Sequence, residues 1–195
     1  MNKCIILAAG KGERMIPLTL KTPKPLLKIK GKAIIDYVLK SLPSEITEII
    51  IVVDYFGEQI KEHVGSSYKG RTVRYAQGSD KGNAYSFFAT RKYLNDEDFL
   101  FIYGDEMPNK TNVKECMAKG LSILTYMSPT LGWQDDGVMV LNTDIFNYFP
   151  LSVKGELHFH SLVEKFVRDH VVSFVKAKNF IGEINTIEQF FKLNE

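Results

Sequence analysis

Residues 3–15 have the sequence KCIILAAGKGERM, and the sequence TPKPLL follows at residues 22–27. The apolar run inside the first stretch is typical of a buried strand in a parallel sheet. It ends in a loop with two glycines, and the loop is followed by Arg14 and Lys24. Glycines let a loop aim several backbone N–H groups at one anion, and the two cations add charge-assisted contacts. The opening therefore predicts a strand that leads into a polyphosphate-binding loop.

Two well-known phosphate loops are excluded by the spacing of this loop. No G-x-x-x-x-G-K-[ST] pattern is present, so the loop is not a Walker loop. The dinucleotide fingerprint begins correctly with Gly10 and Gly12, but Met15 occupies the position of its third glycine. An apolar strand with two glycines also occurs in proteins that bind no nucleotide, so the loop alone leaves the ligand open.

Strand and helix patterns alternate along the chain. Strands are expected at residues 3–9, 48–55, 72–77, 98–106, 120–128, 137–142 and 171–178. Helices are expected at 33–42, 57–64, 83–94 and 158–169, and a last one from Thr186, with Gln189 at the reciprocal capping-box position. The order predicts an α/β fold with a mostly parallel sheet and helices on both faces. No linker-like segment separates the halves, so we expect one domain over residues 1–195.

Composition excludes several classes of protein. The 195 residues carry a net charge of +2, and the 25 Lys and Arg are scattered among 23 Asp and Glu, which does not favour a nucleic-acid-binding surface. No apolar run approaches the roughly 20 residues of a membrane helix. The two cysteines, Cys4 and Cys116, lie in or beside apolar segments and suit a reducing compartment. We therefore expect a cytoplasmic protein without nucleic-acid or membrane partners.

Polar residues follow the ends of other expected strands. Gln77 ends the third strand, and Asp105 follows the fourth after Gly104. Ligands of open parallel sheets lie beyond the carboxyl ends of the strands, so both residues should approach the glycine loop. Asp105 could cap a helix or form a salt bridge there. It could also hold Mg²⁺, which prefers one or two carboxylates together with substrate phosphates.

The N-terminal motifs, taken in order, resemble those of the sugar-1-phosphate nucleotidyltransferases. That family has L-[AG]-[AG]-G-x-G-[TS]-R-[LM]-x-P-L-T followed by P-K-P-[LM], and only Glu13 departs from it locally. The resemblance implies a three-layer sandwich around a Rossmann-like sheet, of the nucleotide-diphospho-sugar transferase type. It implies a single nucleotidyltransferase domain without a C-terminal left-handed β-helix, and a role in nucleotide sugar biosynthesis.

The resemblance also assigns roles to individual residues. Arg14 and Lys24 would be catalytic, and Asp105 would bind Mg²⁺. The nucleotide would contact Leu7, Ala8, Ala9, Gly10, Lys11, Gly12, Gln77 and Gly82. Ala8 and Ala9, in place of a glycine pair, favour a pyrimidine triphosphate.

The acceptor end of the expected site departs from the family pattern. In IGEINTIEQF, Glu183 takes the place of the family's second metal-binding Asp, whereas the phosphocholine cytidylyltransferase branch would place the ligand at Asn185. We expect Glu183 to bind the metal, with Asn185 and Gly137 at the acceptor. The family's E-K-P element is missing before the strand at 137–142. Residues 133–136 could line the acceptor pocket or form a solvated turn.

The leading interpretation is transfer of a nucleoside monophosphate from a nucleoside triphosphate to a sugar 1-phosphate, with Mg²⁺ and release of pyrophosphate. One alternative is a CTP-dependent cytidylyltransferase acting on phosphocholine or another small phosphorylated acceptor. Another is a nucleotide-binding regulatory protein without turnover. The expected partners are the triphosphate and a phosphorylated small molecule, and self-association into a homo-oligomer remains open.

Overall fold

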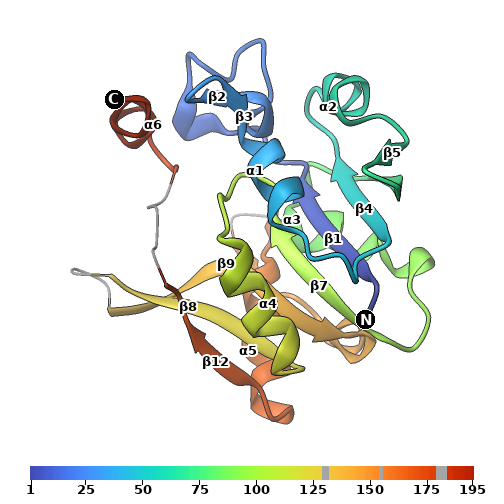
Figure 1. The fold of residues 1–195 in the computed structure, drawn as a ribbon. Helices are drawn as coiled ribbons and strands as arrows, with labels where there is room; N and C mark the ends of the chain where they lie inside the picture. Colours follow the sequence, from blue (N-terminus) through green and yellow to red (C-terminus); the bar gives the residue numbers. More distant parts are fainter. Residues whose placement is uncertain (129–131, 154–155, 179–183) are drawn as a thin grey trace.

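The computed structural model describes residues 1–128, 132–153, 156–178 and 184–195. An eight-stranded sheet runs through the molecule in the order β12-β8-β9-β7-β1-β4-β6-β5 (Figure 1). Its strands are β1 (Lys3–Ala8), β4 (Glu48–Val53), β5 (Ser67–Tyr68), β6 (Arg71–Gln77), β7 (Asp98–Tyr103), β8 (Ser122–Ser128), β9 (Gly132–Asn142) and β12 (Ser173–Lys176).

The centre of the sheet is parallel, as expected. β1 lies between β4 and β7 and pairs with both in parallel, and β6 continues this arrangement beyond β4. The register places Ala8 opposite Val53 and Val53 opposite Gln77, so these strands end in one row. β9 is antiparallel to both β7 and β8, which makes β8 and β12 run in the same direction as β1. The carboxyl ends of six strands therefore share one edge.

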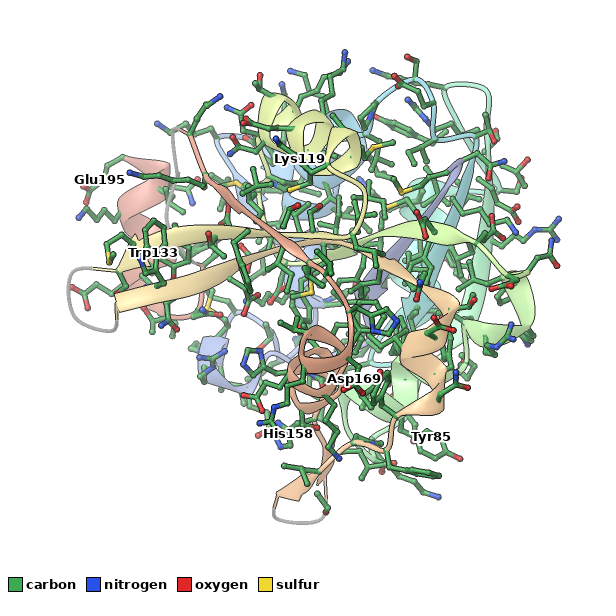
Figure 2. The ribbon with its side chains drawn as sticks, turned by 90° about the horizontal axis from the view of Figure 1, so that it is seen from below. Tyr85, Lys119, Trp133, His158, Asp169 and Glu195 are labelled. Atoms are coloured by element: carbon green, nitrogen blue, oxygen red, sulfur yellow. The ribbon has the colours of Figure 1, made fainter. Side chains whose placement is uncertain are left out.

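Helices cover both faces of the sheet and bury two apolar cores. The helices are α1 (Ile34–Ser41), α2 (Gly57–Val64), α3 (Asn83–Phe88), α4 (Lys110–Ala118), α5 (Phe159–Asp169) and α6 (Ile187–Asn194). Apolar residues of α1, α2 and α4 pack on one face, and those of α3 and α5 pack on the other. Lys119, just after α4, and Asp169, at the end of α5, lie on opposite sides of the sheet (Figure 2). The expected three-layer α/β fold is confirmed.

A third, smaller core joins the two ends of the chain. The hairpin of β2 (Lys28–Ile29) and β3 (Lys32–Ala33) lies beside α6, which is far from it in sequence (Figure 1). The buried members of this core, here called the end cluster, are Met15, Leu27, Ile29, Ile34, Met107, Ile184 and Phe190. Because these residues flank the glycine loop and the end of β7, the C-terminal segment lies next to the carboxyl edge of the sheet.

Some elements differ from the sequence-based expectation. The expected helix at 83–94 ends at Phe88, and the chain continues as a short 3₁₀ helix, Arg91–Tyr93, after the Thr90 hydroxyl donates to Phe87 O at 2.7 Å. The expected strand at 137–142 extends back to Gly132, so residues 133–136 are part of β9 and do not form a turn.

Among the elements that were not expected are one helix, α4, and two hairpins. α4 has few apolar residues and is started by Asn109, whose side chain accepts from Thr111 N at 2.8 Å. The other two are the hairpin β2–β3 and a second hairpin of β10 (Ser152–Val153) and β11 (Glu156–Leu157). Within the part of the chain that the structure describes, every helix is too short or too polar to cross a lipid bilayer.

Candidate active site

A cleft of about 560 Å³ opens at the carboxyl edge of the sheet, which is a typical size for a small-molecule site. Most of the residues predicted to form the site line it. These are Leu7, Ala8, Ala9, Gly10, Lys11, Gly12, Arg14, Lys24, Gly82, Asp105 and Asn185. The β1 loop, the segment before α3, the end of β7 and the C-terminal segment all contribute, so the cleft joins parts of the chain that are distant in sequence.

Gly12 allows the glycine loop to pack closely against Lys24. Its backbone has a φ of +65°, a conformation that favours glycine, and a Cβ there would lie 3.2 Å from Lys24 Cβ and 3.0 Å from Thr19 Cγ2. The Thr19 hydroxyl also donates to Gly12 O at 2.9 Å, which holds the turn. The loop backbone and the lysine stem therefore form one packed unit beside the cleft.

Lys24 and Asp105 form an ion pair in the cleft. Lys24 Nζ lies 2.5 Å from Asp105 Oδ2, with side-chain exposures of 8% and 32% respectively. The ammonium is thus mostly buried, whereas the carboxylate faces the cleft. Lys24 Nζ also donates to Asn185 Oδ1 at 3.4 Å, and Arg14 Nη2 donates to the same oxygen at 3.1 Å. Two cations, one carboxylate and one amide thus converge as a single polar group.

The segment before α3 closes one side of the cleft. Gly82 has a φ of +107°, and a Cβ there would lie 2.4 Å from Leu157 N and O. Leu157 N donates to Lys81 O at 2.9 Å, so β11 packs directly on this segment. The glycine is therefore required by the approach of β11. Gln77 lies outside the cleft lining, but its amide donates at 2.9 Å to Asp54, which lines the cleft.

The other side of the cleft is acidic. Tyr103 lines the cleft, and burial together with the nearby carboxylates of Asp135, Asp105 and Glu106 raises the pKa of its phenol well above the ordinary value. Gly137 on β9 lies against this wall, because a Cβ there would meet Glu106 Cγ at 2.8 Å and Tyr103 Cδ2 at 3.1 Å. Gly137 itself is not part of the cleft lining. The wall offers oxygen acceptors and negative potential.

The oxygen donors of the cleft fit a magnesium ion that also binds substrate phosphates. Among the residues that the structure describes, no cluster of three or more His, Cys, Asp or Glu could hold a metal by itself. Magnesium commonly needs only one or two protein carboxylates when phosphates supply the other ligands. The one-third-exposed Asp105 carboxylate meets this need, and the Asn185 amide oxygen lies beside it across Lys24. Glu183, predicted as a second ligand, lies outside the described residues.

Several cleft residues were not predicted from the sequence. Asp105 was placed near the glycine loop by the strand-end rule, which states that ligands of a parallel sheet lie beyond the carboxyl ends of its strands. Asp54 follows the end of β4, so the same rule would have found it. Tyr103 and Glu106 flank the Gly104-Asp105 pair and could have been found in the same way. His158 also lines the cleft, just before α5. The remaining unpredicted residues of the lining are Glu13, Met15, Pro25, Ser79, Asp80, Asn83 and Ser86.

Three curated relatives each match about half of the chain. A UTP–glucose-1-phosphate uridylyltransferase of Haloferax volcanii is 35% identical over 109 residues, which are 55% of this chain and 44% of that protein. An N-acetylmuramate alpha-1-phosphate uridylyltransferase of Neisseria meningitidis is 39% identical over 107 residues, 53% of this chain and 46% of that protein. A choline-phosphate cytidylyltransferase of Streptococcus pneumoniae is 38% identical over 93 residues, 47% of this chain and 40% of that protein. The chain thus spans less than half the length of these relatives.

Two solved structures share the fold over almost the whole chain. A putative glucose-1-phosphate thymidylyltransferase from Bacillus anthracis superposes with a TM-score of 0.83 at 20% identity, over 98% of this chain and 93% of that one. The inositol-1-phosphate CTP transferase from T. maritima superposes with a TM-score of 0.77 at 18% identity, over 100% of this chain and 97% of that one. The family model described as nucleotidyl transferase matches residues 3–130. With the family's motifs lining one cleft at the carboxyl edge of the sheet, the chain belongs to the nucleotidyl transferase family.

Proposed function

We propose that this protein transfers a nucleoside monophosphate from a nucleoside triphosphate to a sugar 1-phosphate and releases pyrophosphate. The observation that carries the proposal is the convergence of Arg14, Lys24 and Asp105 on the glycine loop in one cleft. A pyrimidine triphosphate is supported by the names of the relatives, which specify uridylyl and cytidylyl transfer. Cys4 and Cys116 are free thiols, which fits a cytoplasmic location.

The residues of the cleft have separate tasks in this reaction. An oxygen of the acceptor phosphate attacks the α-phosphorus, and the bond to the leaving pyrophosphate breaks. The acceptor is already an anion, so alignment and charge screening matter more than a general base. Arg14 and the loop N–H groups would hold the leaving pyrophosphate. Lys24 would lie between the acceptor phosphate and the α-phosphate and reduce their repulsion.

A magnesium ion would be held by Asp105 and by substrate phosphate oxygens. When bound, it would screen the phosphate charges during transfer. Lys24 Nζ contacts only Oδ2 of Asp105, and the carboxylate is 32% exposed, so its other oxygen would remain able to bind the ion.

Phosphocholine is a second candidate acceptor, and the acidic wall of the cleft favours it. Asp135, Asp105 and Glu106 surround Tyr103, and the resulting negative potential would attract a cationic head group. A curated relative is also a choline-phosphate cytidylyltransferase.

An assay of pyrophosphate release in the presence of Mg²⁺ tests the proposal. The triphosphates are UTP, CTP and dTTP, and each is paired with glucose 1-phosphate, N-acetylglucosamine 1-phosphate and phosphocholine as acceptors. Lys24→Ala and Asp105→Ala should each lower kcat by about 100-fold or more while the protein stays folded. Lys28→Ala is the matched control, because Lys28 is an exposed lysine on β2 outside the cleft lining. Near-normal rates in either cleft variant would contradict these roles. Nucleotide binding without turnover in any pair would favour a regulatory protein.

A further inference from the structure

The Asn185 side chain lies between the two cations of the cleft. Its Oδ1 accepts from Arg14 Nη2 at 3.1 Å and from Lys24 Nζ at 3.4 Å, so the two nitrogens are no more than 6.5 Å apart. Two positive charges at this distance repel each other. An amide oxygen between them offsets part of that repulsion through its dipole. It adds no formal negative charge to that of the Asp105 carboxylate, which already pairs with Lys24, so Arg14 and Lys24 are not neutralised further.

The backbone at Asn185 is held on both sides. Ile184 is 1% exposed and belongs to the end cluster. Asn185 N donates to Gln189 Oε1 at 2.8 Å, and the same oxygen accepts from Thr186 N at 2.9 Å in the capping box of α6. Asn185 contributes its backbone N–H to this cap. The side chain can therefore be changed without removing the cap.

The end cluster also supports the other polar residues of the cleft. Met15 directly follows Arg14, Leu27 lies three residues after Lys24, and Met107 lies two residues after Asp105. All three apolar residues are buried with Ile184 in the same cluster. The docking of the C-terminal segment and the placement of the cations are thus parts of one packed arrangement.

We propose that Asn185 is a positioning residue, which holds Arg14 and Lys24 in place for the triphosphate without neutralising them. This inference rests on the proposed function. It differs from the roles at the acceptor or the metal that the sequence suggested for Asn185, since the contacts in the structure are with the phosphate-binding cations. A carboxylate at this position would pair with both cations and compete with the phosphate oxygens.

Binding of UTP to the full chain, measured by calorimetry in EDTA and again in Mg²⁺, tests the proposal. Asn185→Ala should weaken binding in EDTA by about 5- to 10-fold, and Asn185→Asp should weaken it by about 10-fold more, because the new carboxylate competes for the cations. In the steady state, Asn185→Ala should raise KM for the triphosphate more than KM for the acceptor, because Arg14 would bind only the triphosphate whereas Lys24 would contact both phosphates. The melting temperature should stay within about 2 °C of the wild type for both variants.

Asn194→Ala is the matched control, because Asn194 is an amide of α6 that accepts from Lys30 N outside the cleft. It should lower stability and leave UTP affinity unchanged. Equal UTP affinity of the wild type and both Asn185 variants would overturn the inference alone. Tighter binding by Asn185→Asp in Mg²⁺ would assign the position to metal coordination and also overturn it. Failure of the wild type to bind any triphosphate would instead refute the proposed function.

Discussion

Replacing Asp105 with Asn should destabilise the folded protein, because it leaves Lys24 without its carboxylate. The Lys24 side chain is 8% exposed, and its ammonium lies 2.5 Å from Asp105 Oδ2. Removing one member of a fully buried pair costs about 3–5 kcal/mol. Here the carboxylate is 32% exposed, so water in the cleft would solvate part of the remaining charge. We therefore expect a loss of about 1–3 kcal/mol in the free energy of unfolding.

A double-mutant cycle separates this charge effect from other consequences of the substitution. Lys24→Met keeps most of the lysine stem volume and removes the charge, so it should offset much of the loss when combined with Asp105→Asn. The coupling energy should be about 1–2 kcal/mol. The free energy of unfolding would be measured by urea denaturation followed by circular dichroism. The melting temperature of Asp105→Asn alone should fall by about 2–12 °C.

The cycle refutes the reasoning if the two changes are additive. A coupling energy below about 0.3 kcal/mol would mean that the two side chains contribute to stability independently in the ligand-free protein. Lys28→Met is the matched control, because the same substitution is made at an exposed lysine on β2. It should not offset the effect of Asp105→Asn.

Two further predictions concern packing and ionisation. Gly82→Ala should lower the melting temperature by about 4 °C or more, measured by thermal denaturation, since the new Cβ would meet the Leu157 backbone at 2.4 Å. Burial raises the pKa of the Cys116 thiol to about 12 and that of Cys4 further, so both thiols should resist alkylation until the protein is denatured. Above pH 9 both thiols stay protonated in the folded chain, whereas the same thiols ionise in the unfolded chain. The free energy of unfolding, measured by denaturant titration, should therefore fall as the pH rises from 9 toward 12.

Hydrophobic patterning was sufficient to predict the centre of the fold. The runs that became β1, β4 and β7 are almost entirely apolar, because helices cover both sheet faces there. α4 was missed because its inward face carries only a few apolar residues, chiefly Val113 and Cys116. The extension of β9 to Gly132 was missed because the polar residues 133–136 resemble a turn in sequence. These residues form a strand because they pair with β8, and this long-range pairing cannot be read from the local sequence.

The strand-end rule accounts for most of the cleft and also shows its own limit. Parallel register brings the ends of β1, β4 and β7 together, so Asp105 could be placed near the glycine loop before the structure was known. The rule does not distinguish residues that face the cleft from residues one step behind it. Gln77 ends β6 in the same row, and its amide donates to Asp54, which lines the cleft, although Gln77 itself lies outside the lining.

The position of Asn185 depends on packing that has no local sequence signal. The capping box of α6 was visible in the sequence, and the structure confirms it. Nothing in that motif says which part of the molecule α6 contacts. That contact is decided by Ile184 and Phe190, which pack with residues from the first third of the chain and from the segment after β7. The same cap then orients the Asn185 backbone, so a local motif acquires a role in the cleft only through this long-range packing.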